Sequence, residues 1–377
     1  MTDFHAIIPA GGAGTRLWPL SRSNAPKFLA DLTNAGQSLL QATVRRLESL
    51  TGENIVVVTG RKHAFAVSRQ LRLLAGRNII VEPSPRDSMA AIGLATAVIA
   101  QRYGDVVVGS FAADHLIADE EAFHDAVREA IAAAKAGYVV TIGITPDHAA
   151  TGFGYIHATE VVDGLTRARA VSEFLEKPDA HTAQEYVASG KYLWNAGMFV
   201  ARTSVLLGAL ERFEPELHAG IMRLATAWDT SARDEVLAEE WPKLKKIAID
   251  HAIAEPLAAA GGVAVVPVEM GWSDVGDYAS LRDVQRKDAQ SPDVQTPDAQ
   301  TEPVSGVAPG GSLQPVISRE SPGALVYTHS KPVALLGIPN AVVVETADAI
   351  LVTTRDHAQS VKNIVDDFDG LGLEHLR

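Results

Sequence analysis

A glycine-rich turn near the N-terminus is the strongest chemical signal in the sequence. The run Gly-Gly-Ala-Gly-Thr-Arg at residues 11–16 follows directly after the short apolar run at residues 6–8. Glycines at the carboxyl end of a strand let backbone N–H groups approach phosphates closely. The turn has Leu17 where a dinucleotide fingerprint needs its third glycine, and it lacks the Gly-Lys-Ser/Thr of a Walker loop. Arg16 and the nearby Lys27 add two cations, which suits charge developing on a phosphoryl group.

Two acidic residues follow other apolar runs and are candidate metal ligands. Asp114 comes shortly after the run at residues 106–108, and Asp274 follows the run at residues 263–268. An acidic residue at the carboxyl end of a parallel strand lies in the crevice where α/β proteins bind ligands. Two such carboxylates can hold Mg²⁺ against phosphate oxygens. Each alone is also typical of a turn or a helix cap, and spacing in sequence does not show that the two meet in space.

The elements that must position these residues alternate between strands and helices. We expect strands at residues 6–8, 55–58, 79–81, 106–108 and 139–142, and helices at about 38–50, 62–75, 88–102 and 119–136. Such alternation predicts an α/β fold with a Rossmann-like, mostly parallel sheet flanked by helices. The near-continuous apolar character of the strands fits burial on both faces of the sheet.

The rhythm changes after residue 150, where the chain becomes less regular. Strands are expected at 152–156 and 170–174, a short helix at 180–189, and a loop entering a further strand at 193–200. We expect this half to supply the pocket for the acceptor. Residues 286–312 contain a near-repeat rich in Pro, Asp and Gln, which predicts a flexible linker or loop. The domain prediction is therefore a main domain at 1–285, this linker, and a small β-rich domain at 313–377.

The bulk composition excludes several classes of protein. A net charge of -13 over 377 residues argues against a general binder of nucleic acid, so phosphate chemistry must be local. No apolar run approaches the roughly 18–20 residues of a membrane helix. Cysteine is absent, which excludes disulfides and thiolate metal sites. The first residues lack a basic n-region, so we expect a cytoplasmic protein.

Taken together, these motifs resemble the sugar nucleotidyltransferase family, and within it the enzymes that act on mannose 1-phosphate. The glycine-rich turn continues as Leu-Trp-Pro-Leu-Ser-Arg and is followed by Pro26-Lys27. The further motifs occur in the family's order at residues 82–83, 113–115, 152–156, 176–178, 194–199 and 272–276. The resemblance runs from about residue 4 to 285, and the tail is similar to the short left-handed β-helical extension of many members. The chain is thus identified as a member of the guanylyltransferase branch.

The resemblance implies an activity and a set of roles. The expected reaction transfers GMP from GTP to mannose 1-phosphate, giving GDP-mannose and pyrophosphate, in a Mg²⁺-dependent homodimer. The residues implied to bind the nucleotide are Ala10, Gly11, Gly12, Gly14, Thr15, Arg16, Glu82, Ser88 and Asp114. Those implied to bind the sugar phosphate are Gly152, Glu176, Lys177 and Asn195. Those implied to be catalytic are Arg16, Lys27, Asp114 and Asp274, of which the two aspartates are the implied metal ligands.

Glu82 is the residue implied to select the base. An ionised carboxylate only accepts hydrogen bonds, whereas guanine offers adjacent N1–H and N2–H₂ donors. Relatives that use thymine or uracil are similar except for a Gln at this position, so Glu82 favours GTP. The sequence departs from the family at Lys27, which runs straight into Phe28 without the usual Gln, and at Asp87-Ser88-Met89-Ala90, which replaces the usual Asn-Thr-Ala-Pro.

Two alternative functions remain open. One is a thymidylyl- or uridylyltransferase that acts on glucose 1-phosphate, against which Glu82 and the Trp194-Asn195 segment argue. The other is a catalytically silent regulatory relative that binds sugar nucleotides. Retention of all four catalytic candidates argues against it, because a silent copy has no need of them.

Overall fold

The computed structural model describes residues 3–12, 14–289 and 303–377, except for the side chains of residues 286–289. The chain forms two compact units, and each is described by itself. The first unit comprises Met1–Gly11, Thr43–Ala113 and Ile117–Trp272. The second comprises Gly12–Ala42, Asp114–Leu116 and Ser273–Arg377.

The first unit is built on a nine-stranded sheet, as far as the described residues go, with the order β3-β2-β1-β4-β8-β5-β9-β7-β6. Its strands are β1 (Phe4–Ala10), β2 (Ile55–Gly60), β3 (Ile79–Glu82), β4 (Val107–Ser110), β5 (Val139–Ile144), β6 (Gly154–Val161), β7 (Arg169–Glu176), β8 (Tyr192–Arg202) and β9 (Val263–Pro267). The strands β3, β2, β1 and β4 pair in parallel, and so do β5 and β9. β8 lies antiparallel between β4 and β5, so β4 and β5 run in the same direction. The carboxyl ends of β3, β2, β1, β4, β5 and β9 therefore lie at one edge of the sheet.

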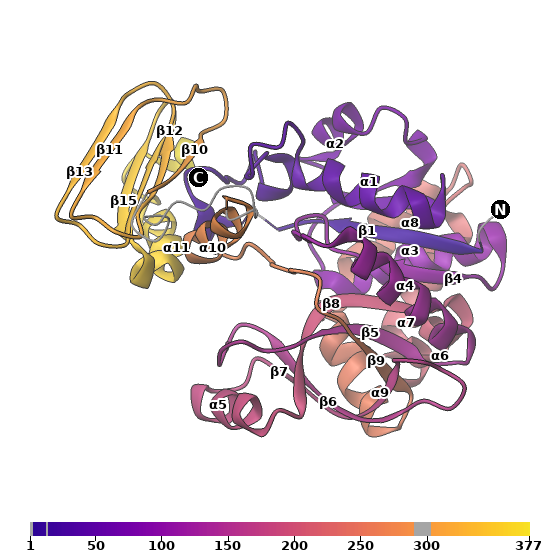
Figure 1. Cartoon of the computed structure of the whole chain (residues 1–377). Coiled ribbons are helices and arrows are strands. Elements are labelled where there is room, and N and C mark those ends of the chain that lie inside the picture. The colour runs from indigo at the N-terminus through magenta and orange to yellow at the C-terminus, as the bar shows by residue number, and fades with distance from the viewer. Residues whose placement is uncertain (1–2, 13, 290–302) are drawn as a thin grey trace. The chain divides into compact units, whose positions relative to one another are not determined.

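Helices cover both faces of this sheet (Figure 1). The helices up to residue 259 are α1 (Leu39–Thr51), α2 (Ala64–Gln70), α3 (Asp87–Tyr103), α4 (Glu120–Lys135), α5 (Ala180–Ser189), α6 (Thr203–Phe213), α7 (Pro215–Ala227), α8 (Arg233–Glu240) and α9 (Glu255–Ala259). α3, α6 and α7 pack together over one face, and the central part of α3, Met89–Ile99, is buried there. α4 covers the other face and begins where Asp119 accepts a hydrogen bond from Ala122 N at 2.9 Å.

The second unit holds the C-terminal β-rich region (yellow in Figure 1). Its elements are α10 (Tyr278–Ala289), β10 (Val304–Val307), β11 (Val316–Arg319), β12 (Leu325–Thr328), β13 (Val333–Leu336), β14 (Ala341–Glu345), β15 (Ile350–Thr354) and α11 (Val361–Asp366). One sheet has the order β10-β12-β14-β15 and the other pairs β11 with β13. The segment after the glycine-rich turn packs into the same core. Tyr278 donates its hydroxyl to Leu17 O at 2.8 Å, and Trp18 Nε1 donates to Leu376 O at 2.8 Å.

The elements predicted for the first half of the chain are present, and helix α2 is the main difference. Helix α2 spans only Ala64–Gln70 where 62–75 was predicted, because Leu71 leaves the helical conformation and the next leucine, Leu73, is fully exposed. The less regular half also contains helices α6 to α9, which the motifs in that half did not predict.

The chain divides differently from the predicted domains. Residues 12–42 belong with the C-terminal region because Leu17, Trp18 and Leu20 are buried in its core. The segment 286–312, predicted to be a linker, holds the last turn of α10 and strand β10. Residues 290–302 of that segment lie outside the described residues.

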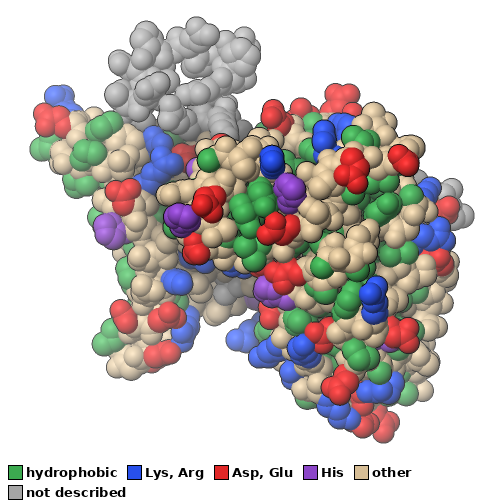
Figure 2. Space-filling model, turned by 90° about the horizontal axis from the view of Figure 1, so that it is seen from below, with side chains coloured by type: hydrophobic (Ala, Val, Ile, Leu, Met, Phe, Trp, Pro, Cys, Tyr) green, Lys and Arg blue, Asp and Glu red, His purple; other side chains and the backbone are tan. Residues whose placement is uncertain are grey.

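No helix in the described part of the chain is both long enough and apolar enough to cross a membrane. On the face shown in Figure 2, acidic and basic side chains are interspersed.

Candidate active site

Lys27 is the centre of a charged cluster in the second unit. It begins a short 3-10 helix, Lys27–Leu29, and its Nζ lies 3.0 Å from Asp114 Oδ2. The same ammonium donates to the backbone oxygen of Asp274 at 2.6 Å. The Lys27 and Asp114 side chains are only 13% and 20% exposed, so this ion pair is partly shielded from water. The structure therefore brings together three of the four predicted catalytic residues.

Two glycines leave the space that this cluster needs. Gly14 has a φ of +60°, and a Cβ there would lie 2.9 Å from Ser21 Oγ and 3.2 Å from Lys27 Cγ. A Cβ on Gly276 would lie 2.9 Å from Asp274 Oδ2. Glycine is required at residue 14 for its left-handed backbone as well as for the close packing. Part of the glycine signal in the sequence thus serves to position Lys27.

Val275 lies between Asp274, a predicted metal ligand, and Gly276, and its backbone is strained. Its φ is +46°, in the left-handed region that a β-branched residue rarely adopts. Its side chain is fully buried, and its carbonyl oxygen lies 3.4 Å from Lys27 Nζ. Such strain costs on the order of 1–3 kcal/mol and clusters at functional sites. The strain here holds a carbonyl oxygen toward the ammonium.

The remaining residues predicted for the triphosphate are distributed over the glycine-rich turn. Arg16 lies in the 3-10 helix Thr15–Leu17, is exposed, and forms no ion pair within the described residues. Gly11 and Gly12 are also exposed. Ala10 is buried at the end of β1, and its carbonyl oxygen accepts from Thr59 Oγ1 at 2.9 Å. Arg16 is therefore the cation of this turn that is available to an incoming anion.

Glu82, predicted to contact the base, ends strand β3 in the first unit. Its Oε1 is buried and has no hydrogen-bond partner in the described structure. Burial raises the pKa of the Glu82 carboxyl from 4.5 to about 7. Ser88, the other residue predicted on this side, uses its hydroxyl oxygen to accept from Ile249 N at 2.9 Å. Glu82 thus keeps one buried acceptor without a hydrogen-bond partner, whereas Ser88 ties α3 to a neighbouring loop.

The predicted sugar-binding residues Glu176 and Asn195 meet in the first unit. Gly154 pairs with Glu176 across β6 and β7. A Cβ on Gly154 would lie 2.5 Å from Glu176 Oε2 and 3.3 Å from the Asn195 Cβ, so the Glu176 carboxylate and the base of the Asn195 side chain both lie beside this glycine. Lys177, with a φ of +50°, donates from Nζ to Glu176 Oε1 at 2.7 Å. Gly152 lies in the exposed loop before β6.

A bulge in β8 gives Asn195 its direction. Thr141 of β5 pairs with Phe199, but Gly143 pairs with Asn195, so β8 carries two extra residues at this point. Gly197 inside the bulge has a φ of +67°, which favours glycine. A bulge bends its strand and re-aims the neighbouring side chain. Asn195 is consequently buried, at 7% exposure, although a loop was predicted to precede the strand here.

Sequence reasoning missed Asp250, which contacts this sugar-site cluster. Asp250 begins a π-helix, Asp250–Ala254, and its Oδ1 accepts from Asn195 Nδ2 at 2.8 Å. Burial, and secondarily the charge of Glu176, raises the pKa of the Asp250 carboxyl to about 6. A π-helical turn has no simple sequence signal. The one feature of the sequence that could have indicated Asp250 is its position as a charged residue within the mainly apolar run at residues 247–254.

The two predicted metal ligands provide a donor set that fits Mg²⁺ better than a transition metal. Asp114 and Asp274 offer carboxylate oxygens, and Asp274 Oδ1 already accepts from Gly276 N at 3.2 Å. No group of three His, Cys, Asp or Glu side chains able to hold a metal ion occurs in the described residues. Mg²⁺ is commonly bound by one or two carboxylates, with waters and substrate phosphates completing its shell. The residues present are therefore compatible with a metal that arrives together with a phosphate substrate.

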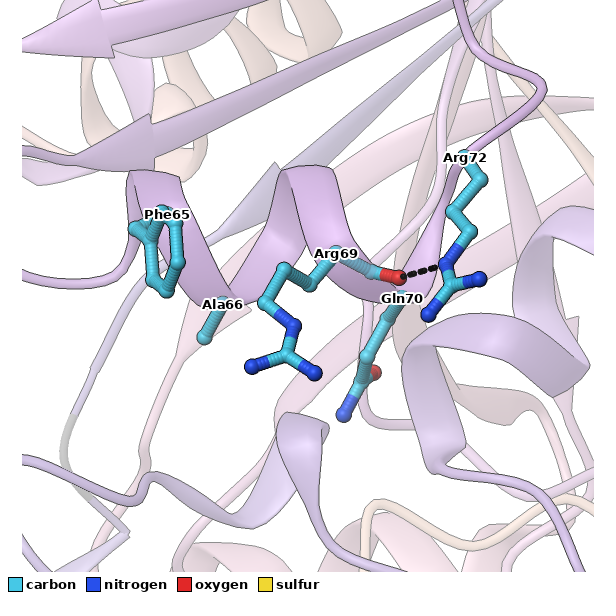
Figure 3. A pocket seen from close by; sticks show the side chains of 5 residues that line it. All are labelled: Phe65, Ala66, Arg69, Gln70 and Arg72. Atoms are coloured by element: carbon cyan, nitrogen blue, oxygen red, sulfur yellow. Dashed lines mark hydrogen bonds between the residues drawn. The ribbon is translucent and has the colours of Figure 1, made fainter.

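A shallow hollow of about 400 Å³ lies elsewhere, on helix α2 (Figure 3). It is lined by Phe65, Ala66, Arg69, Gln70 and Arg72. None of the residues predicted to bind substrate is among them, and there is no carboxylate. The hollow therefore has no part in the chemistry considered above.

Two families match the chain. The family described as Nucleotidyl transferase matches residues 5–291, and the one described as MannoseP isomerase/GMP-like beta-helix domain matches residues 314–368. Mannose-1-phosphate guanylyltransferase ManC of Salmonella typhimurium is 38% identical over 391 residues, which cover 100% of this chain and 75% of that relative. The xanthan biosynthesis protein XanB of Xanthomonas campestris is 38% identical, covering 99% of this chain and 74% of its own.

Two solved structures have folds similar to that of this chain. The crystal structure described as a mannose-1-phosphate geranyltransferase from Thermus thermophilus is 29% identical and has a TM-score of 0.83. It covers 98% of this chain and 100% of that one. A mannose-6-phosphate isomerase structure from Helicobacter pylori, 24% identical with a TM-score of 0.58, covers 71% of this chain and 99% of that one and shows a similar fold.

Proposed function

This chain belongs to the nucleotidyl transferase family, and on that premise we propose that it transfers GMP from GTP to mannose 1-phosphate, giving GDP-mannose and pyrophosphate. The observation that carries the proposal is the match of 100% of this chain to 75% and 76% of two relatives named for this activity. The unsatisfied carboxylate of Glu82 supports the choice of guanine, because guanine presents two adjacent donors.

The reaction is an in-line displacement at phosphorus. A phosphate oxygen of mannose 1-phosphate forms a bond to the α-phosphorus of GTP, while the bond from that phosphorus to the bridging oxygen breaks. Pyrophosphate leaves with the electron pair. A sugar phosphate is ionised near neutral pH, so no general base is required, and catalysis consists of positioning and neutralising charge.

We assign the phosphate chemistry to the second unit's cluster. The Lys27 ammonium is held by a carboxylate and two carbonyl oxygens, which use its three N–H donors, so a phosphate oxygen would take the place of one of these contacts, the longest being the 3.4 Å contact to Val275 O. Arg16 adds an exposed guanidinium with no competing ion pair in the described residues. Asp114 and Asp274 would hold Mg²⁺, which supplies positive charge to phosphate oxygens when it is bound. The protein's own contribution is to fix these groups before the substrate arrives.

We assign the mannose hydroxyls to Glu176 and Asn195, beside Gly154. A carboxylate accepts hydrogen bonds and an amide N–H donates them, which suits the hydroxyl groups of a hexose. The exposed Lys177, which pairs with Glu176, is the cation that we assign to the acceptor's phosphate. The homodimer and the cytoplasmic location expected from the sequence stay predictions.

Pyrophosphate release tests the proposal directly. GTP, dTTP and UTP are each combined with mannose 1-phosphate and glucose 1-phosphate, and we expect the fastest release from GTP with mannose 1-phosphate. Lys27→Met should abolish most of this release, whereas the matched control Lys62→Met, at an exposed residue before α2, should not. A preference for dTTP or UTP with glucose 1-phosphate would support the thymidylyl- or uridylyltransferase alternative. No release from any pair would support the regulatory alternative.

A further inference from the structure

The side-chain amide of Asn195 is held by three hydrogen bonds in the first unit. Its Oδ1 accepts from Thr141 Oγ1 at 2.8 Å and from Gly197 N at 3.1 Å. Its Nδ2 donates to Asp250 Oδ1 at 2.8 Å. An amide has two acceptor lone pairs and two N–H donors. Both lone pairs are therefore used, and of the two donors one has no partner in the described residues.

Two partners decide the orientation of this amide: the backbone N–H of Gly197 and, as the one side chain that does so, Asp250. If the amide turned by 180°, its NH₂ group would face the N–H of Gly197, and its oxygen would face the carboxylate of Asp250. Thr141 would not oppose the turn, since a hydroxyl both donates and accepts. The turned amide thus loses two hydrogen bonds, and the contact with a carboxylate becomes repulsive. An unpaired buried polar group is costly, so the observed orientation is strongly preferred.

The surroundings of Asp250 keep it in place for this role. It stands at the start of the π-helix, and single π-helical turns are frequent at functional sites. The backbone N–H of Glu176 donates to Glu255 Oε1 at 3.3 Å, and Glu255 Oε2 lies 2.9 Å from His251 Nδ1. These contacts tie the end of β7, which carries Glu176, to the helical segment that carries Asp250.

We infer that Asp250 is a positioning residue for the sugar acceptor, acting through the amide of Asn195. With the amide fixed, one Nδ2–H remains to donate to a hydroxyl oxygen of the acceptor. The Glu176 carboxylate lies beside Gly154 and can accept from a hydroxyl hydrogen. The inferred ligand is a hexose phosphate with a hydroxyl that both accepts from Asn195 and donates to Glu176. The inference rests on the proposed function and specifies how its acceptor is recognised.

A double-mutant cycle tests whether Asp250 acts through Asn195. Asp250→Ala and Asn195→Ala should each raise the KM for mannose 1-phosphate by about tenfold or more, the scale of losing one hydrogen bond involving a charged group. The KM for GTP should stay within about twofold of wild type. Because the two residues act as one unit, Asp250→Ala should add little in the Asn195→Ala background. A residue with only a structural role would instead change both KM values and combine additively.

Two further variants test the same inference if Asp250→Ala folds poorly. Asp250→Asn keeps an oxygen that accepts from Asn195, and it should restore most of the acceptor affinity. Thr141→Val removes a hydrogen bond to Asn195 that does not fix the orientation of the amide, so it should raise the acceptor KM clearly less than Asp250→Ala does. Asp105→Ala is the matched control, because it removes a carboxylate that pairs with Arg202, and it should leave both KM values unchanged.

The outcomes separate this inference from the proposed function. A wild-type protein that releases no pyrophosphate from any substrate pair overturns both. A wild-type protein active with mannose 1-phosphate, combined with additive effects in the cycle, overturns only the positioning role of Asp250. Equal changes in the KM for GTP and for mannose 1-phosphate would do the same.

Discussion

Replacing Glu82 by Gln should stabilise the protein while impairing its use of GTP. Glu82 keeps a buried oxygen without a hydrogen-bond partner, and its pKa is raised from 4.5 to about 7 by burial. Both features are costs that the ligand-free protein bears. A glutamine keeps a polar group at this position but carries no charge, so it relieves the cost of burying the charge. If the carboxylate binds guanine, the substitution also removes that contact. Stability and activity should therefore change in opposite directions.

The size of the stabilisation follows from the pKa shift and depends on pH. A carboxyl with a raised pKa in the folded state opposes folding wherever the unfolded chain is ionised. The cost is absent well below pH 4.5, grows up to about pH 7, and is constant above that value. The shift corresponds to about 3 kcal/mol near pH 8 and about 1 kcal/mol near pH 5. Glu82→Gln should raise the free energy of unfolding by up to these amounts.

Urea unfolding of the wild type and variant between pH 5 and pH 8 measures this difference. The control is Glu53→Gln, which removes the charge of an exposed glutamate just before β2. Its effect on the free energy of unfolding should be small, as is usual for an exposed side chain. If Glu82→Gln behaves like this control, burial does not raise the pKa of Glu82 and the reasoning is refuted.

The nucleotide arm of the experiment follows the catalytic efficiency for GTP, dTTP and UTP. Loss of a bidentate base contact should cost about 1–3 kcal/mol for GTP and less for the pyrimidine nucleotides. In the wild type, GTP use should improve as the pH rises through about 7, because guanine binds the ionised carboxylate. The variant should lack this rise. An unchanged order and ratio of nucleotides would remove Glu82 from the base site.

Two other predictions concern the cluster around Lys27. Asp114→Asn and Asp274→Asn should each lower turnover by roughly two to three orders of magnitude without unfolding the protein, and near-full turnover at limiting Mg²⁺ would contradict their role as metal ligands. Gly14→Ala should destabilise by about 1–2 kcal/mol through its left-handed backbone and also lower kcat/KM, because its Cβ would crowd the stem of Lys27. Gly36→Ala is the matched control, since Gly36 has a φ of +77° but nothing within 4 Å of the added Cβ. It should lose a similar stability and keep its activity, and equal activity in both alanine variants would show that the packing of Lys27 is unimportant.

The sequence alone was sufficient for the family and for the class of fold. Motifs in a fixed order over residues 4–285 predicted a sugar nucleotidyltransferase with a β-rich tail, and both are confirmed. The periodicity of apolar residues also located β1 to β5 and helices α1, α3 and α4 to within a few residues. These features are local, because each depends on side chains within one element or one turn. For the same reason the sequence placed Lys27 beside the glycine-rich turn.

Contacts between residues far apart in the chain could be seen only in the tertiary structure. The ammonium of Lys27 bonds to the backbone of Asp274, 247 positions later, and this contact has no counterpart in any local pattern. Asn195 bonds to Asp250, 55 positions later, because a bulge in β8 and a π-helix turn the two side chains toward each other. Bulges and π-helical turns break the regular periods of 2 and 3.6 from which elements are predicted. The sequence therefore predicts Asn195 as a sugar ligand, whereas its hydrogen bond to Asp250 is visible only in the folded chain.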